Sequence, residues 1–485
     1  MAVLAIGSMR EDSATADEAA HIAAGLIKLR EGRIDFYATQ TPLIEAAIAA
    51  PLAMSGYRVP EEWRQYGNRP WLAGHMLLYR GGYDWQRILR MARLPVIALL
   101  LALCFTVWSF VREVTGDDVA ALAAFALTGF CPTLLAHGRL ATVDLGVTLF
   151  AFLATVLLLR FLRTPSLFLA IATGIAVACT LTSKVSGALI VPFFAIVIGL
   201  WLARKRRVHW RLLAIAAIAS IATFMLVYLL VGRSVDLTLP FRAYLSEVHA
   251  VRAFYLANPL PQFLLGEFSQ DGWPHYYLVA IAVKTPLPAL ALLIIGIIRA
   301  RRFEAVVCLL FAALFLLVSA FSSLNLGIRH VLPIYPFLFA ACAITVTRRI
   351  TVVLTAAHVL IALLAYPSYL SYFNPLIGSH RNADRVLIDS NLDWGQDLRR
   401  LAHWTRENDI GVIRVHYFGA GSVEHELRSR GMRWSAPRAE PLPKGWFAVS
   451  RHFYRLRSGY DAYLRGSGAR YVTTIGGSID VYRVP

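Results

Sequence analysis

Two adjacent carboxylates and an imidazole lie close together near the start of the chain, in the stretch TADEAAH of residues 15–21. The side chains of Asp17 and Glu18 can accept a proton from an attacking hydroxyl group, and His21 follows about one helical turn later. The stretch also fits the S/T-x-x-E pattern of a helix-capping box, which gives Thr15 and Glu18 a structural role. The cap leaves Asp17 and His21 unassigned, so both interpretations stay open.

Charged side chains interrupt the apolar segments of the chain at only a few other places. Such charges are costly and mark candidate functional sites. They are Asp144 in AHGRLATVDLGVTLF, Lys184 in LTSKVSG, Lys284 in YYLVAIAVKTPLPAL, and Arg329 and His330 in LNLGIRHVLPIYPF. Lys and Arg can hold a phosphate and neutralise the charge that it gains as a leaving group. Because all these charges are expected on one side of a membrane, together they indicate chemistry on a phosphate-bearing donor.

Each charge also has a structural interpretation. Asp144 would favour the positive end of the helix that it begins. The side chain of Lys284 can reach the lipid headgroups, and Arg329 can anchor on lipid phosphates. A lone histidine such as His21 is more often structural than a ligand. The shared location, rather than any single residue, favours a site.

Long apolar segments make up much of the chain. Of its 485 residues 57% are hydrophobic and the mean hydropathy is +0.56, whereas soluble domains average about 45–50%. Ten segments match the hydrocarbon core of a bilayer, namely 94–111, 119–136, 143–159, 167–182, 186–203, 212–231, 276–298, 305–321, 331–347 and 350–370. All five cysteines lie inside these segments, which argues against a disulfide framework.

The net charge of +18 follows the predicted loops. Short loops after the odd-numbered segments are rich in Arg and Lys, as in ARKRRVHWR at 203–211, whereas the alternate loops carry few. Lys and Arg are retained on the cytoplasmic side. This pattern predicts an inner-membrane, multi-pass protein with residues 1–93 and the tail after 371 in the exoplasmic space. The charge excess therefore reflects topology, and no nucleic-acid partner is expected.

Three parts are predicted along the chain. Residues 1–93 form an exoplasmic first loop with membrane-surface helices. AVLAIGSM is too short to span, so a preceding transmembrane helix is expected to be missing. Residues 94–373 form an all-α polytopic bundle with an exoplasmic loop at 232–275. Residues 374–485 contain the strand-like RVLIDS, GVIRVHYFG, GWFAVS and SIDVYRV, with a helix at DLRRLAHWTREN, and form a soluble α/β domain.

Within that domain, the stretch NLDWGQD pairs Trp394 with the carboxylates of Asp393 and Asp397 and with Gln396. A flat aromatic face beside carboxylates is typical of a binding loop. Asp393 can equally cap the helix that follows.

The chain resembles glycosyltransferase family 39, the protein O-mannosyltransferase-like enzymes, in its bacterial phospholipid-carrier-dependent members. The matching stretches occur in the family's order between residues 13 and 400, and are SATADEAAHIAAG, AHGRLATVDLGVTLF, LTSKVSGALIVP, GWPHYYLVAIAVKTPLP, LNLGIRHVLPIYPF and DSNLDWGQDLRRL. The resemblance implies a GT-C fold whose first exoplasmic loop carries a catalytic acid pair. It also implies inverting transfer of a sugar from a polyprenyl-phosphate donor to a hydroxyl acceptor on a protein, lipid or glycan.

The resemblance implies roles for the singled-out residues. Asp17 would be the base, with Glu18 supporting the acceptor or the fold, and Asp144 orienting the acceptor. Lys284 and Arg329 would hold the donor phosphate, with Lys184 as a weaker candidate. Further substrate-binding candidates are His21, His330, Tyr276 and Trp273.

The chain is expected to depart from the family in three respects. The family's first transmembrane helix precedes the loop with the acid pair, and here that helix is expected to be missing. Relatives often have HPPL in the first loop, where this chain has TQTPLIE, so specificity is expected to differ. Some aminoarabinose-type relatives bind a metal in this region. Here no His, Cys, Asp and Glu cluster has ligand spacing, so a reaction without metal or cofactor is expected.

Two other functions compete with a transferase. Broken helices at KTPLP and VLPIYP would suit a secondary transporter, although charges crowded at one face and the lack of duplicated halves argue against it. A truncated, non-catalytic relative would instead bind sugars or lipids in the membrane.

Overall fold

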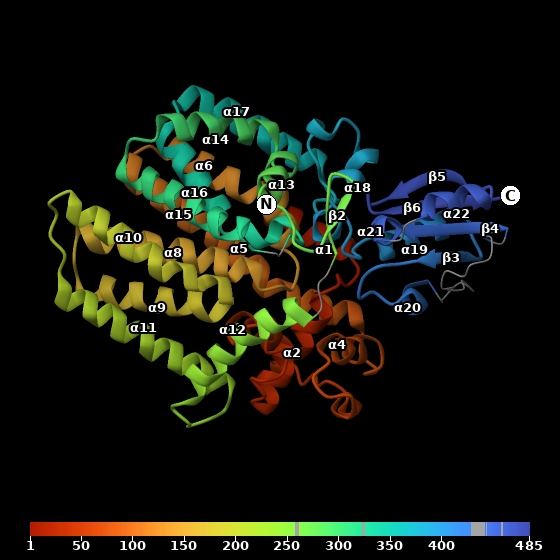
Figure 1. The fold of residues 1–485 in the computed structure, drawn as a ribbon, viewed down its shortest axis with the longest axis horizontal. Coiled ribbons are helices and arrows are strands. Elements are labelled where there is room, and N and C mark those ends of the chain that lie inside the picture. Colours follow the sequence, from red (N-terminus) through yellow and green to blue (C-terminus); the bar gives the residue numbers. More distant parts are fainter. Residues whose placement is uncertain (258–260, 323–324, 428–441, 443, 457–458) are drawn as a thin grey trace.

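A bundle of apolar helices forms most of the molecule, and a small mixed domain lies at one end of it (Figure 1). The computed structural model describes residues 1–485 except 258–260, 323–324, 428–441, 443 and 457–458. The loop between α10 (Ile190–Ala203) and α11 (Trp210–Val231), with its run of basic residues, lies at the end of the bundle away from the mixed domain (Figure 1).

The N-terminal segment folds into short helices packed against the bundle. They are α1 (Ala2–Glu11), α2 (Glu18–Glu31), α3 (Pro42–Met54), the 3-10 helix η1 (Glu61–Tyr66) and α4 (Pro70–Tyr79). Helix α2 is buried at every position from Glu18 to Lys28, so it does not lie on the membrane surface as expected. It crosses α3 so closely that a Cβ on Gly25 would lie 2.1 Å from the Glu45 carbonyl oxygen.

The bundle contains helices of very different lengths. They are α5 (Trp85–Thr115), α6 (Asp118–Gly129), α7 (Pro132–His137), α8 (Asp144–Arg163), α9 (Leu167–Ser183), η2 (Val185–Leu189), α10, α11, α13 (Tyr276–Lys284), α14 (Leu287–Arg299), α15 (Phe303–Ala320), η3 (Ile328–Val331), α16 (Ile334–Thr345) and α17 (Arg348–Leu364). Over the described parts of the chain, five helical stretches are long and apolar enough to cross a membrane, at Trp85–Thr115, Asp144–Arg163, Val185–Ala203, Trp210–Val231 and Phe303–Ala320. Five apolar helices are shorter. The protein is thus a helical, multi-pass membrane protein, and the number of ten spans stays a prediction.

Proline residues break two of the predicted continuous segments. The segment 276–298 divides into α13 and α14 at Thr285–Pro286, because proline has no N–H and pushes the preceding residue into an extended conformation. The segment 119–136 divides in the same way before Pro132, into α6 and α7.

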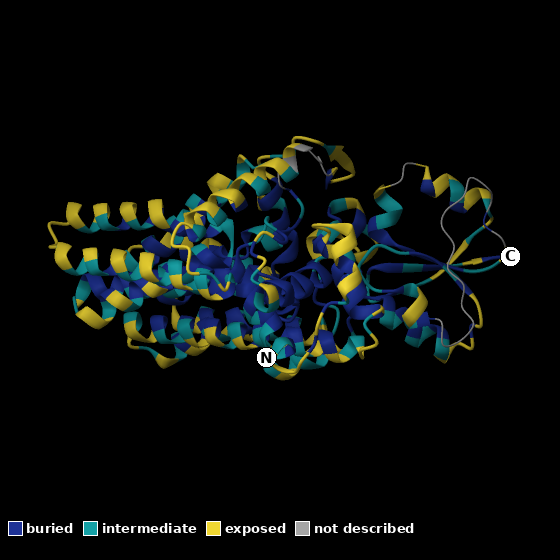
Figure 2. Cartoon of the chain, turned by 90° about the horizontal axis from the view of Figure 1, so that it is seen from below, coloured by how far each residue is buried: buried dark blue, intermediate teal, exposed yellow. Residues whose placement is uncertain are grey.

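Apolar side chains cover both the inside and the outside of the bundle. Figure 2 shows exposed residues along the outer faces of the helices away from the mixed domain. Many are large and apolar, including Phe168, Ile218, Leu230, Ile298 and Leu364. An outward apolar surface of this kind suits a lipid environment.

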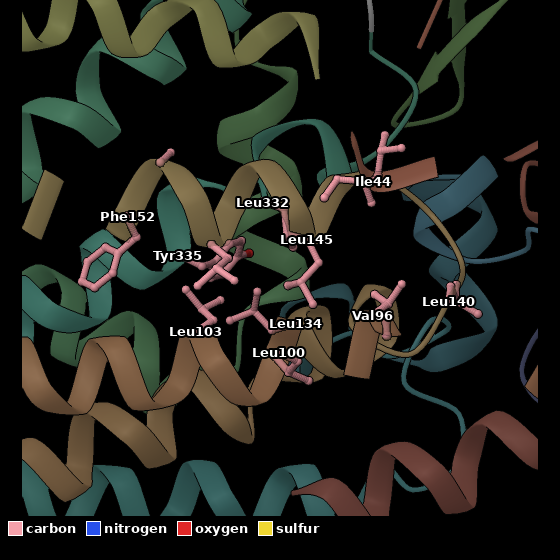
Figure 3. Packing of buried hydrophobic residues seen from close by; sticks show 14 of the residues in the cluster. Ile44, Val96, Leu100, Leu103, Leu134, Leu140, Leu145, Phe152, Leu332 and Tyr335 are labelled. Atoms are coloured by element: carbon pink, nitrogen blue, oxygen red, sulfur yellow. The ribbon is translucent and has the colours of Figure 1, made fainter. Parts of the chain in front are cut away.

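The core of the bundle reaches the residues that flank the predicted site. Leu145, which follows Asp144, and Leu332, which follows η3, are both fully buried and pack with Leu134 (Figure 3). Dense packing of this kind restricts the movement of the helix ends that carry the charged residues.

The predicted loop 232–275 contains α12 (Leu239–Ala257) and a hairpin of β1 (Gln262–Leu264) and β2 (Glu267–Ser269). Helix α12 packs against α11. Its Glu247 accepts a hydrogen bond from the Tyr228 hydroxyl at 2.6 Å.

The C-terminal domain has a four-stranded sheet in the order β3-β4-β6-β5. The strands are β3 (Ile413–His416), β4 (Gly445–Ser450), β5 (Arg470–Ile475) and β6 (Ile479–Val484), with β3 parallel to β4 and the other pairs antiparallel. The helical elements are η4 (Pro375–Ile377), η5 (His380–Asn382), α18 (Ala383–Val386), η6 (Asp389–Asn391), α19 (Leu398–Glu407), α20 (Val423–Leu427), α21 (Arg451–Leu456) and α22 (Tyr460–Gly466). Three expected strands and the expected helix α19 are confirmed.

The expected strand RVLIDS is wrong, because this segment forms α18 and η6. Polar side chains at the end of this segment and just after it bind the bundle instead of a neighbouring strand. Asn391 Oδ1 accepts from the Ile328 amide at 2.9 Å, and Ser390 Oγ donates to the Leu326 carbonyl at 3.0 Å. The fourth strand of the sheet is instead β5, which the sequence analysis did not predict.

Candidate active site

A cavity of about 600 Å³ opens where the N-terminal segment meets the bundle. Its polar lining comprises Asp17, His21, Thr39, Gln40, Lys184, Ser186, Ser319, Ser322, Arg329 and His330, and its aromatic lining Tyr37, Trp71, Phe254, Tyr277 and Phe315. The remaining lining is apolar, with Leu189, Pro192, Val251, Val318 and Leu326 among the residues. The cavity therefore has a charged part and an apolar part.

Two carboxylates, of Asp17 and Asp144, and two cations, Arg329 and Lys184, lie close together at the charged part of the cavity. Arg329 Nη2 lies 3.0 Å from Asp17 Oδ2, and Nη1 lies 3.7 Å from Asp144 Oδ2. Lys184 Nζ lies 2.6 Å from Asp144 Oδ1. The four residues come from the start of α2, the start of α8, the end of α9 and η3. The structure thus brings together four of the residues that the sequence singles out.

The two acids differ in their access to the cavity. The Asp17 side chain is 18% exposed and lines the cavity. The Asp144 side chain is 1% exposed, and its two oxygens face Lys184 and Arg329. Asp144 is therefore placed to hold the two cations, which differs from the acceptor-orienting role expected for it.

Glu18 points away from the cavity and is held inside the fold. Arg93 Nε and Nη2 donate to its two carboxylate oxygens at 2.7 and 2.6 Å, and the Ala141 amide donates at 2.8 Å. The Thr15 amide and hydroxyl donate at 3.0 and 3.1 Å. Helix α2 begins at Glu18 with Asp17 as its N-cap and without a side-chain cap bond, so Thr15 does not cap it as the expected capping box requires. Burial raises the pKa of the Glu18 carboxyl, but the Arg93 charge outweighs burial and holds the pKa below its usual value. Glu18 supports the fold rather than the acceptor.

Lys284 does not reach the cavity, in contrast to its expected phosphate-binding role. Its Nζ donates to the carbonyls of Leu370 at 2.8 Å and Asn391 at 2.5 Å, and lies 4.4 Å from the ring centroid of Phe373. Its charge is satisfied by carbonyl dipoles between the bundle and the start of the C-terminal domain.

The four further candidates divide evenly between the cavity and the core. His21 and His330 line the cavity. Tyr276 and Trp273 do not line it: the Tyr276 hydroxyl accepts from Asn391 Nδ2 at 3.0 Å, and Trp273 packs on the core. The neighbouring Tyr277 lines the cavity instead.

The two histidines present different nitrogens to their surroundings. His21 Nδ1 lies 2.9 Å from Glu45 Oε1, and Lys28 Nζ lies 2.5 Å from Glu45 Oε2, so the Lys28 charge compensates that of Glu45. This pairing leaves Nε2 of His21 for a ligand. His330 Nε2 is buried and, within the described structure, has no hydrogen-bond partner. Burial and the nearby cations Lys184 and Arg329 lower the pKa of His330 well below its usual value.

The stretch NLDWGQD fits neither interpretation expected for it. Helix α19 begins after Asp397, so Asp393 does not cap it. Asp393 instead accepts from the Ser450 hydroxyl and the His452 amide. Trp394 is 2% exposed, and Arg329 Cζ lies 4.4 Å from its ring centroid. The side chains of Asp393 and Trp394 are both buried and make contacts within the protein, so neither is exposed to bind a ligand directly.

Several lining residues carry no signal that sequence reasoning can use. Tyr37, Trp71 and Gln40 come from the first 93 residues, where aromatic and polar side chains are common. Tyr37 and Gln40 lie in the segment between α2 and α3, and Trp71 lies near the start of α4, so their meeting depends on how these helices pack. In the described part of the chain, no group of three or more His, Cys, Asp or Glu side chains is arranged to hold a metal, and metal independence stays a prediction.

The fold is that of the GT-C class of membrane proteins, as two similar solved structures show. ArnT from Cupriavidus metallidurans in the apo state is 13% identical, with a TM-score of 0.52, and the match covers 100% of this chain and 96% of that chain. The structure of the same ArnT bound to undecaprenyl phosphate is 12% identical, with a TM-score of 0.50 and the same coverage.

A family model gives the second comparison. Residues 79–241 match the model described as dolichyl-phosphate-mannose-protein mannosyltransferase. No curated protein matches the chain. These findings confirm the resemblance to glycosyltransferase family 39 that the sequence motifs indicate.

Proposed function

We propose that the protein is an inverting glycosyltransferase that moves a sugar from a polyprenyl phosphate to a hydroxyl acceptor on the exoplasmic face of the inner membrane. The observation that carries the proposal is the bridge from Arg329 to Asp17 and Asp144 at the charged part of an otherwise largely apolar cavity. A donor with a charged phosphate and a long apolar chain needs a cavity of this two-part character.

The cations of the cavity are suited to the phosphate of the donor. A guanidinium has five N–H donors in one plane, so Arg329 can bridge carboxylates and a phosphate oxygen together. Lys184 supplies a second positive charge, and its side chain is 17% exposed to the cavity. The buried carboxylate of Asp144 fixes both cations in place.

The apolar lining is suited to the lipid of the donor. Leu189 at the end of η2, Pro192 near the start of α10 and Val318 near the end of α15 all line the cavity. ArnT, whose fold this chain shares, has been solved with undecaprenyl phosphate bound, which supports a donor of that chemistry here.

Asp17 is the base in the proposed reaction. Its carboxylate takes the proton of the acceptor hydroxyl as the oxygen attacks the anomeric carbon of the sugar. The bond from that carbon to the phosphate oxygen breaks on the opposite face, and the electron pair stays on the phosphate. Arg329 and Lys184 neutralise the resulting negative charge. One displacement of this kind inverts the anomeric configuration.

The test uses the full chain in lipid nanodiscs with a panel of labelled undecaprenyl-phosphate sugars. We expect release of free undecaprenyl phosphate, and we expect Asp17→Asn to lower the rate at least about 100-fold, the usual scale for loss of a general base. Asp236→Asn is the matched control, because Asp236 pairs with Arg242 at the exposed start of the loop before α12, outside the cavity lining.

The two alternative functions give different results in the same system. Binding of donor without release would identify a non-catalytic binding protein. Counterflow of labelled substrate in sealed vesicles, with the donor intact, would identify a transporter. Either result, or equal rates for Asp17→Asn and wild type, contradicts the proposal.

A further inference from the structure

Trp394 of the C-terminal domain contacts both sides of the Asp17–Arg329 ion pair. Arg329 Cζ lies 4.4 Å from its ring centroid. Its backbone carbonyl accepts a hydrogen bond at 2.9 Å from the amide of Ala16, the residue before Asp17. One residue of the tail thereby contacts the cation directly and the acid through its chain neighbour.

Further contacts join the same loop of the tail to the segment before Asp17. The Ser13 amide donates to the Gln396 carbonyl at 2.9 Å. Asp12 is ion-paired with Arg400 at 2.8 Å and with Arg139 of the bundle at 2.7 Å. Residues 12–16 are therefore held between the bundle and the C-terminal domain.

The loop that carries Trp394 is itself fixed within its domain. Asp393 accepts from the His452 amide at 3.0 Å and from the Ser450 hydroxyl. Gly395 has φ +92°, and a Cβ there would lie 2.5 Å from the Gly419 Cα, so the turn requires glycine. A loop held in this way can position what packs on it.

We infer that Trp394 is a positioning residue for the proposed transfer, because its ring keeps the Arg329 guanidinium in the orientation that serves both carboxylates and the donor phosphate. The inference rests on the proposed function, since it concerns the same site. A planar guanidinium over an indole face is a cation–π contact, which is strongest where water is excluded. The C-terminal domain is then part of the active site.

The activity test compares Trp394→Met with Trp394→Phe in the full chain. Methionine fills volume but has no ring face, whereas phenylalanine keeps a smaller one. We expect Trp394→Met to lower kcat/KM for the donor about tenfold, the scale of a desolvated cation–π contact, and Trp394→Phe to recover most of it. Equal losses in both variants would overturn the inference, because a residue that only fills the core is not rescued by a ring.

Phe447→Met is the matched control within the same domain. Phe447 is 1% exposed and belongs to a separate core cluster around Leu442, Val449 and Tyr460. We expect its kcat/KM to stay within twofold of wild type even if its melting temperature falls. A loss as large as that of Trp394→Met would show a general effect of domain stability and overturn the inference.

A stability measurement tests the contact independently of activity. In a double-mutant cycle, melting temperatures are measured for Trp394→Met, Arg329→Gln and the combined variant. Because the two side chains touch, we expect the effects to be non-additive by about 2 °C or more. Additive effects would overturn the inference. The cycle is repeated with Trp394→Leu, which also lacks a ring face, if the Met variant does not fold.

The two proposals can fail separately. If the wild-type chain releases no undecaprenyl phosphate from any donor, the proposed function fails while the cycle still decides whether Trp394 holds Arg329. If the wild type is active and Trp394→Met matches its kcat/KM, only the positioning role fails.

Discussion

Glu18 and Arg93 form a two-point ion pair that is buried at both ends, with Nε–Oε1 2.7 Å and Nη2–Oε2 2.6 Å. The pair joins the start of α2 to α5. The preceding residue, Asp17, instead faces the cavity and Arg329. Two consecutive acids therefore have opposite environments, one closed inside the fold and one open to a ligand.

The first prediction separates these two acids. Glu18→Ala leaves the buried charge of Arg93 without its partner, so we expect the free energy of unfolding to fall by about 3–5 kcal/mol. Asp17→Asn keeps the shape of a partly exposed side chain, so its melting temperature should stay close to that of wild type while its activity is lost. Thermal unfolding in one detergent compares the two variants. A stable Glu18→Ala variant would contradict the supporting role.

The second prediction separates the two lysines. Lys284→Met leaves the carbonyls of Leu370 and Asn391 without a donor, each at a cost of about 1–3 kcal/mol. We expect a lower melting temperature and an unchanged KM for the donor. Lys184→Met removes a cation from the cavity lining, so its KM for the donor should rise about tenfold. Initial rates over a donor series give both values, and a raised KM for Lys284→Met would return that residue to the phosphate site.

The third prediction concerns the pH dependence of stability that comes from Glu247 on α12, a helix that lines the cavity. Burial raises the pKa of Glu247 from its usual value of 4.5 to about 8. The folded state then binds more protons than the unfolded state between these values, so stability falls as pH rises through this window, by at most about 1.4 kcal/mol per unit. Glutamine stays neutral at every pH, so we expect the stability of Glu247→Gln to fall less than that of wild type as the pH rises. Melting temperatures from pH 6 to pH 9 measure it.

Glu267→Gln is the control for this pH dependence, because Glu267 is an exposed glutamate on the hairpin after α12. It should follow the wild-type curve. Parallel curves for wild type and Glu247→Gln would show that Glu247 is already charged in the folded protein. Since Val251 and Phe254 on the same helix line the cavity, we also expect the donor KM of wild type to rise above pH 8.

The fourth prediction tests the cavity side of His21. Its Nδ1 is engaged by Glu45, so Nε2 is the nitrogen that a sugar hydroxyl can meet. His21→Phe should raise KM about five- to tenfold, as expected for one lost hydrogen bond. His75→Phe serves as control, because His75 lies on α4 outside the cavity lining. If both variants behave alike in the rate assay, His21 has no contact with substrate.

The meeting of Asp17, Asp144, Lys184 and Arg329 could be expected from sequence because each interrupts or ends an apolar segment on the same predicted side. Helix ends on one side of a bundle are confined to a small area, so their charges approach one another. Lys284 has the same sequence pattern, yet its Nζ donates to the backbone carbonyls of Leu370 and Asn391 outside the cavity. Carbonyls are present at every residue, so no residue type marks where they converge.

The sequence predicts the fold class better than it predicts where helices end and which segments form strands. Apolar composition identifies a bundle, but Pro286 and Pro132 divide segments that hydropathy joins. RVLIDS has the composition of a strand, yet Ser390 at its end and Asn391 just after it bond to Leu326 and Ile328 of the bundle. The stacking of Trp394 on Arg329 joins residues 65 positions apart along the chain, and neither local sequence indicates the other.

The hydrogen bonds and the ion pair between residues 12–16 and the C-terminal domain also set the order in which these parts of the chain can fold. Residues 12–16 precede every helix of the bundle along the chain, whereas Trp394, Gln396 and Arg400 follow all of them. The segment before Asp17 cannot take its final position until its last partners have been translated and have folded. Because Asp17 directly follows this segment, the place of its carboxylate beside Arg329 is set only after the C-terminal domain has folded.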